Sequence, residues 1–155
     1  MRTVFRVLAW IVAALVVVQA MSMVWGIAGE LKWIQEGGVL DKAAMESEET
    51  RFPEVVGFMI HGMNGMMVIP AIALLLLISS FFTKIPRAWM WAGLVLVLVA
   101  VQVTLGLAGP AVPFLGALHG LNALLLFGTA IYTARLGRTV AAPAVEREPA
   151  MAPRS

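Results

Sequence analysis

The sequence contains no cysteine and only two histidines among its 155 residues. Without cysteine the chain forms no disulfide, offers no thiolate to a metal and performs no thiol chemistry. Charge is scarce as well, because 13% of the residues are charged whereas 61% are hydrophobic. A soluble domain cannot bury that much apolar surface, so the composition predicts a protein whose main partner is the lipid bilayer.

Three long stretches carry no charged residue at all, namely residues 7–29, 55–83 and 88–134. A membrane-spanning helix needs about 20 apolar residues, so the first two stretches each fit one span and the third fits two. Glycine and proline divide the third stretch near its middle, at Gly109, Pro110 and Pro113. We therefore predict an all-α membrane protein in which residues 1–138 form an antiparallel bundle of four transmembrane helices, at about 5–29, 55–83, 88–109 and 113–135.

The start of the chain also resembles a secretory signal peptide, because Arg2 and Arg6 precede an apolar run. Residues 18–20 form a weak version of a cleavage site. The apolar run continues to Ala28, however, and is longer than the usual signal core of about 7–15 residues. We therefore favour a retained membrane helix over a cleaved signal peptide.

The basic residues beside the predicted helices indicate their orientation. Six of them fall on one side of the four-helix arrangement: Arg2, Arg6, Lys84, Arg87, Arg135 and Arg138. The positive-inside rule assigns that side to the cytoplasm. The outer loop at residues 30–54 holds seven acids and three basic residues. We expect a multi-pass protein of the cell membrane with both termini in the cytoplasm.

The end of the chain differs in composition from the predicted bundle. Residues 139–155 are rich in proline and alanine, and we expect them to form a disordered cytoplasmic tail. The isoelectric point of about 9.5 reflects the basic cytoplasmic flanks of the helices. It therefore does not indicate a nucleic-acid partner.

The two histidines stand in the same seven-residue frame. The first copy reads HGMNGMM from His61, and the second reads HGLNALL from His119. The preceding helices also correspond, because one carries Gln19 before GIAG and the other carries Gln102 before GLAG. The pattern predicts two helix-hairpin repeats, each with a histidine on its second helix.

Both histidines are expected at a similar depth in the membrane. If their helices start at Pro53 and Pro113, His61 lies about 12 Å and His119 about 9 Å along the helix axis. The second and fourth helices of an antiparallel bundle are diagonal neighbours, so the two imidazoles can meet across the core. Two facing imidazoles can bind both faces of a haem iron. We therefore predict one haem b per chain, with both histidines as its metal ligands.

Residues close to the histidines fit a cofactor site. Small residues share a helix face with each ligand and leave room for a flat macrocycle: Gly57, Gly65, Gly116 and Ala123. Asn64 and Asn122 follow their histidines by three residues and either form interhelical hydrogen bonds or orient the imidazoles. Glycine in a membrane helix also serves close helix packing, so a packing role for the whole motif is the alternative.

Other residues are assigned accessory roles. Pro70 and Gly128 each lie nine residues after a histidine and are expected to bend the helices around the haem. Lys32 and Arg51 lie in the outer loop near the helix ends. They either pair with the haem propionates or anchor the helix ends among acidic neighbours.

The segments VQVTLGLAG at 101–109 and PFLGALHGLNALLLFGTA at 113–130 resemble two consecutive helices of the haem A synthase family. The first is similar to that family's Q-x-x-L-G helix, and the second to the helix whose outer histidine binds haem. The likeness is best over residues 90–134 and extends to 19–80 through the repeated histidine frame. It implies that His61 and His119 form the axial pair of one four-helix half.

The chain departs from that family in ways that bear on activity. Family members have two such halves, one for the substrate haem and one for a structural haem b, whereas this chain has a single half. The family places an acid close before its first histidine, but the nearest acid here is Glu54, seven residues before His61. The cysteine pair found in the outer loop of some members is missing.

Three functions are consistent with the sequence. The first is a small b-type haem protein of the membrane that serves electron transport, haem handling or assembly of a respiratory-chain complex. The second is a haem A synthase-like enzyme acting as a homodimer, with Glu54 as its candidate catalytic acid. The third is a cofactor-free accessory subunit of a larger membrane complex. Bis-histidine ligation leaves no open position on the iron, which favours electron transfer.

Overall fold

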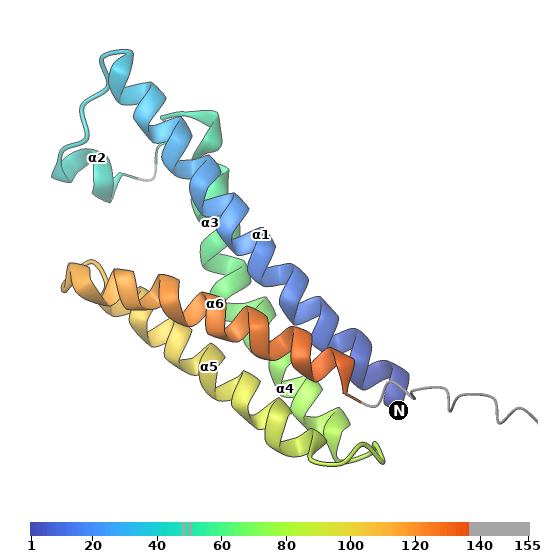
Figure 1. The fold of residues 1–155 in the computed structure, drawn as a ribbon. Helices are drawn as coiled ribbons and strands as arrows, with labels where there is room; N and C mark the ends of the chain where they lie inside the picture. Colours follow the sequence, from blue (N-terminus) through green and yellow to red (C-terminus); the bar gives the residue numbers. More distant parts are fainter. Residues whose placement is uncertain (48, 50, 137–155) are drawn as a thin grey trace, which may run out of the picture.

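The computed structural model describes residues 1–47, 49 and 51–136, and every regular element within them is a helix (Figure 1). The tail expected at 139–155 lies outside the described residues. Four helical segments are long and apolar enough to cross a membrane: Arg2–Gln35, Pro53–Ser80, Ala88–Ala108 and Pro113–Arg135. The predicted all-α class and the four candidate membrane spans are therefore confirmed.

The first helix, α1 (Arg2–Gln35), continues six residues beyond the predicted end at residue 29. The extra turns contain leucine, lysine, glutamate and glutamine, which are all good helix formers. Two residues after the end of α1, Gly37 has a φ of +100°, which suits glycine. The Gly38 N–H donates to the Trp33 carbonyl at 3.0 Å, and the Gly37 N–H donates to the Ile34 carbonyl at 3.1 Å. These two bonds form a Schellman motif, which stops the helix.

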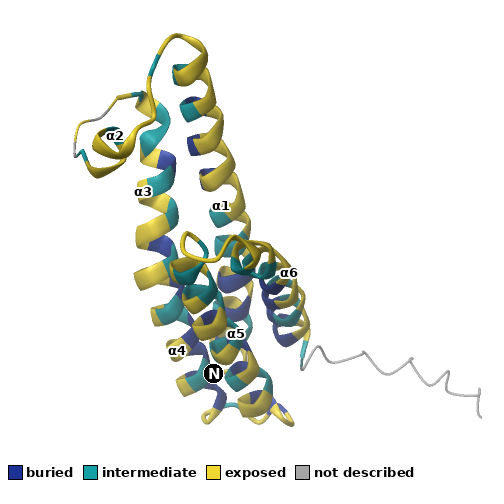
Figure 2. Cartoon of the chain, turned by 90° about the vertical axis from the view of Figure 1, so that its left-hand side faces the viewer, coloured by how far each residue is buried: buried dark blue, intermediate teal, exposed yellow. Residues whose placement is uncertain are grey.

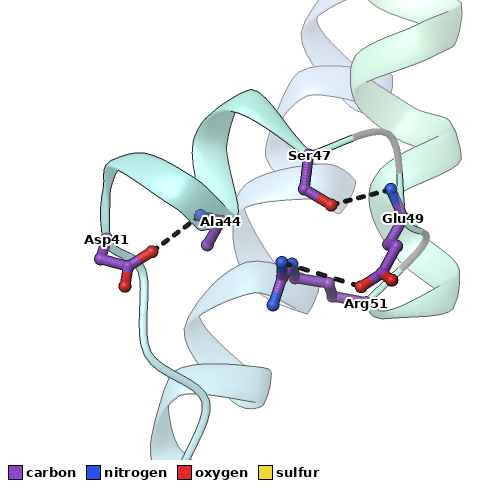
Figure 3. A network of polar contacts seen from close by, with 5 residues as sticks. All are labelled: Asp41, Ala44, Ser47, Glu49 and Arg51. Atoms are coloured by element: carbon purple, nitrogen blue, oxygen red, sulfur yellow. Dashed lines mark hydrogen bonds and ion pairs between the residues drawn. The ribbon is translucent and has the colours of Figure 1, made fainter.

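The loop after α1 is held by local polar contacts (Figure 3). Its short helix α2 (Lys42–Glu46) is capped by Asp41, whose carboxylate accepts a backbone N–H at 2.7 Å. The Ser47 hydroxyl accepts the Glu49 N–H at 3.0 Å, and the Arg51 guanidinium lies 3.8 Å from the Glu49 carboxylate. Arg51 is thus paired with an acidic neighbour inside the loop.

The second span is interrupted near its first histidine. It consists of four consecutive pieces: η1 (Pro53–Val55), α3 (Val56–Met63), the π-helix η2 (Asn64–Val68) and α4 (Ile69–Ser80). Pro70 follows the π-helix by two residues and has no N–H to continue the regular bonding pattern. The π-helix lies just before Pro70, and the bend around a haem that the sequence suggested there stays a prediction. Such π-helical turns are frequent at functional sites.

The last two spans are regular. The helix α5 (Ala88–Ala108) and the helix α6 (Pro113–Arg135) agree closely with the predicted ranges. A tight turn at residues 109–112 joins them, and Pro113 occupies the first position of α6, where a missing N–H costs nothing. At Gly128 the helix α6 continues as a regular α-helix, without a π-helical turn like that before Pro70. The bend expected at Gly128 stays a prediction.

Helix packing places the second span and α6 at opposite corners of the bundle. The helix α1 contacts α3, α4 and α6, and α5 contacts α4 and α6. The core lies at the end where the chain begins, and it includes Phe5, Val12, Leu76, Val95, Leu126 and Ala130. At this end the Arg6 side chain donates to the Ala134 carbonyl at 3.1 Å. The α1–α3 pair diverges from the α5–α6 pair toward the other end (Figure 1).

Large apolar side chains cover the outer faces of the helices. Figure 2 shows exposed residues along the outward faces of the long helices. The exposed large apolar side chains include Trp10, Leu75 and Val97, each at least 40% exposed. Such a surface is unfavourable in water and suits the acyl chains of a bilayer.

Candidate functional site

The two histidines approach each other across the bundle. His61 projects from α3 and His119 from α6, and their ring centroids are 6.2 Å apart with planes inclined by 47°. Both side chains are half-buried. The structure thus brings together the two residues that the sequence proposed as a ligand pair.

Each imidazole is bound to the backbone of the helix that precedes its own span. The His61 Nδ1 lies 3.1 Å from the Gln19 carbonyl oxygen, and the His119 Nδ1 lies 3.0 Å from the Gln102 carbonyl oxygen. A carbonyl only accepts hydrogen bonds, so Nδ1 must carry the proton in both rings. In the neutral imidazole, each Nε2 then keeps a free lone pair. A backbone carbonyl on the second ring nitrogen is a common arrangement among metal-binding histidines.

Two glutamine–asparagine pairs support the histidines. The Asn64 amide donates to Gln19 Oε1 at 3.2 Å, and the Asn122 amide donates to Gln102 Oε1 at 2.6 Å. The Asn64 amide also donates to the Leu15 carbonyl at 3.5 Å, and the Asn122 amide donates to the Leu98 carbonyl at 2.9 Å. Each of these carbonyls belongs to the residue four positions before the glutamine of the pair. Both asparagines are buried. They form the interhelical hydrogen bonds that the sequence suggested, and their bonds go to the glutamines and to backbone carbonyls.

The surroundings of His61 and His119 differ in one hydrogen bond. The Gln19 side-chain N–H donates to the His61 carbonyl at 3.0 Å, beside the start of the π-helix η2. Among the described residues the Gln102 side-chain N–H has no corresponding acceptor. We did not predict either glutamine as a site residue. Each glutamine lies on a largely apolar helix that precedes a histidine-bearing helix, and this matching place was the available signal.

The predicted glycines have different surroundings. A Cβ at Gly65 would lie 2.5 Å from Gln19 Nε2, so this glycine makes room for the glutamine side chain. A Cβ at Gly57 would collide with the Ser22 carbonyl, so this glycine serves the contact between α1 and α3. Gly116 faces open space, with nothing within 4 Å of an added Cβ. Of the three, Gly116 best fits the expected role of leaving room beside a ligand.

A fourth glycine, which the sequence reasoning missed, lies against His119. A Cβ at Gly106 on α5 would be 3.1 Å from both Cε1 and Nδ1 of that ring. Such a distance is tighter than ordinary contact, so glycine at this position lets the imidazole reach the Gln102 carbonyl. The GLAG segment contained this glycine, but its spacing from His119 gave no reason to connect the two.

Two cavities adjoin the histidine pair. The larger, of about 570 Å³, lies mainly between α1 and α6, and the smaller, of about 450 Å³, lies mainly between α3 and α5. Both are lined by His61, His119, Gln19, Gln102 and Gly65, so the two rings stand where the cavities meet. Ala123 lines the larger cavity and Gly116 the smaller. No carboxylate, lysine or arginine occurs among the described residues that line them.

The separation of the rings fits a shared metal. An imidazole nitrogen binds a metal at about 2 Å, so rings on opposite sides of one ion have centroids roughly 6 Å apart. The observed 6.2 Å agrees with this value. Within the described residues no three His, Cys, Asp or Glu side chains form a metal-binding group. An ion here would receive two ligands from the chain and needs its other ligands from another molecule.

The charged candidates lie away from the histidines. Glu54 packs against Gly29 of α1 and does not line either cavity. Lys32 lies 3.9 Å from the Glu36 carboxylate, with both side chains well exposed. It follows Gln19 by 13 residues on the same helix, which corresponds to about 20 Å along the axis. Propionates beside the histidines would therefore be out of its reach.

Comparison of the chain with protein-family models, with curated proteins and with solved structures finds no match. The resemblance to haem A synthase stays a prediction from short motifs. The geometry around the two histidines is therefore the basis for inferring a function.

Proposed function

We propose that this is an integral-membrane electron-transfer protein in which His61 and His119 hold one b-type haem between them. The observation that carries the proposal is the histidine pair itself. The rings come from opposite corners of the bundle, have centroids 6.2 Å apart, and each bind a carbonyl through Nδ1. Both Nε2 atoms are thereby available to one metal ion.

The surroundings of the pair favour a macrocycle over a bare ion. A porphyrin supplies the four equatorial nitrogens that the chain lacks, and it must extend sideways from the iron. The cavities on either side of the rings provide space of about 570 and 450 Å³. Most of their lining is apolar, with Val99 and Phe127 in the larger and Leu107 in the smaller, which suits the porphyrin surface.

The residues of the chain determine what such a site does. When bound, haem supplies one-electron chemistry at its iron. Because both imidazoles would bind the iron, the site would transfer electrons and would not bind oxygen. The apolar lining would keep water away, and the hydrogen bond that each Nδ1–H donates to a carbonyl would raise the basicity of the ligand. Both features would influence the reduction potential.

We also infer that the bundle is antiparallel, consists of two hairpin repeats and has both termini in the cytoplasm. The repeated contacts of Gln19 with His61 and of Gln102 with His119 support an internal duplication. The contact between Arg6 and Ala134 supports a common side for the two ends of the bundle. The distribution of basic residues in the sequence assigns that side to the cytoplasm.

The enzymatic alternative has less support from the structure. A haem A synthase-like homodimer was expected to use Glu54, which lies against α1 and outside both cavities. The remaining alternative, a cofactor-free subunit of a larger complex, predicts that the purified protein binds no haem.

A visible spectrum of the detergent-purified protein, expressed with haem supplied, tests the proposal. We expect about one haem per chain and, after reduction, the sharp α and β bands of a low-spin b-type haem. Protein that folds without binding haem, or that gives a high-spin spectrum, would contradict it.

A further inference from the structure

We propose that Gln19 and Gln102 are positioning residues, which hold both imidazoles as Nδ1–H tautomers with their Nε2 atoms available to one ion before any metal binds. The inference deepens the function proposed above, which gives the free Nε2 atoms their role. It is a statement about the metal-free chain, however, so it can be tested separately from haem binding.

In the first half the Gln19 side chain fixes the turn that carries the imidazole. Its Oε1 accepts from Asn64 at 3.2 Å, and its Nε2 donates to the His61 carbonyl at 3.0 Å. Both partners lie on the second span, three residues apart. The amide therefore holds this turn against α1, where the Gln19 carbonyl accepts the ring N–H. Gly65 leaves the space that the amide occupies.

Around His119 the same arrangement forms with one hydrogen bond fewer than around His61. Gln102 Oε1 accepts from Asn122 at 2.6 Å, and the Gln102 carbonyl accepts the His119 ring N–H at 3.0 Å. Gly106 allows the close approach of the ring to α5. Among the described residues the Gln102 side-chain N–H makes no bond like that of Gln19 to the His61 carbonyl. Loss of the Gln102 side chain should therefore disturb its histidine less than loss of Gln19.

The tautomer matters because a neutral imidazole has one nitrogen available to a metal. In water the proton of a neutral histidine prefers Nε2, which would block the nitrogen that the pair needs. The carbonyls of Gln19 and Gln102 reverse this preference at both rings. A site prepared in this way does not need to reorganise its ligands when the metal arrives.

Nitrogen-15 NMR of histidine-labelled, haem-free protein at alkaline pH tests the inference directly. The chain has only two histidines, so His61→Ala and His119→Ala assign every signal. We expect a protonated Nδ1 and an unprotonated Nε2 in both rings. In Gln19→Leu the His61 signals should move to a mixture of tautomers while those of His119 stay unchanged. Gln102→Leu should have the reciprocal and smaller effect.

Thr104→Val is the matched control. Thr104 lies two residues from Gln102 on α5 and is exposed, and among the described residues its hydroxyl bonds to the Ala100 carbonyl of its own helix alone. This variant should leave both rings unchanged. If a leucine variant fails to fold, Gln19→Asn and Gln102→Asn keep an amide but shorten its reach, and they should shift the tautomers in the same direction.

The outcomes separate the two proposals. A protonated Nε2 at either ring of the wild type, or Gln19 and Gln102 variants with unchanged signals, would overturn the positioning role even if haem binds. Wild-type protein with both expected tautomers and no affinity for haem would overturn the proposed function and leave the positioning role standing.

Discussion

At the scale of single residues, the position of His119 depends on Gly106. A side chain there would press on Cε1 and Nδ1 of the imidazole, since even a Cβ lies 3.1 Å from both. Overpacking costs about 1–3 kcal/mol, so Gly106→Val should weaken haem binding by roughly tenfold. Haem titration of the purified variant measures this loss.

Gly93→Val is the control for that prediction. Gly93 lies on the same helix and has nothing within 4 Å of an added Cβ. The Gly93→Val variant should bind haem with the affinity of the wild-type protein. Equal affinity in the Gly106 and Gly93 variants would mean that the His119 ring position is not important for the cofactor.

The sequence identified the histidines and asparagines of this site but not the glutamines and Gly106. The His-x-x-Asn frame is visible in the sequence, because residues three positions apart in a helix lie on nearly the same face. Gln19 precedes His61 by 42 residues, whereas Gln102 precedes His119 by 17. The correspondence of Gln19 and Gln102 is visible in the sequence, but only helix packing brings each carbonyl to its imidazole.

At the scale of helices, the contact between α1 and α3 depends on Gly57. Its added Cβ would meet the Ser22 carbonyl and would lie 2.8 Å from the Gly26 nitrogen, and neither is a flexible side chain. Gly57→Ala should therefore destabilise the protein by about 1–3 kcal/mol, the usual cost of overpacking. Thermal unfolding in detergent should show a midpoint several degrees lower.

Gly93→Ala provides the comparison for Gly57. It replaces a glycine in the interior of α5 with a better helix former and meets nothing within 4 Å, so its midpoint should not fall. An unchanged midpoint in Gly57→Ala would show that α1 and α3 are free to separate at this point.

Helix ends and irregularities were predictable to different degrees. The uncharged stretches predicted the membrane spans, because charged residues mark the edges of the hydrocarbon layer. The helix α1 nevertheless continues to Gln35, since the residues beyond this edge also favour helix. The Schellman motif at Gly37 sets the true end, and the adjacent glycines were its visible signal. Pro70 marked the irregular second span, but nothing in the sequence specified a π-helix at Asn64–Val68.

At the scale of the whole molecule, the proposed orientation predicts which positions are accessible from outside the cell. The natural chain has no cysteine, so a single introduced thiol reports without background. Ser47→Cys, in the loop after α2, should react with an impermeant maleimide in intact cells. Ser155→Cys, which lies outside the described residues, should react only after the cells are opened. The opposite pattern would reverse the orientation and place the histidines in the cytoplasmic half of the membrane.

The central claim is that one haem is held between both histidines, and single-histidine variants test it most directly. The reduced wild-type protein should give a low-spin spectrum, whereas His61→Gly and His119→Gly should lose the haem or become high-spin. Added imidazole should restore the low-spin bands in each variant, because it occupies the axial position that the missing side chain leaves. A low-spin spectrum that persists without added imidazole in either variant would contradict the claim.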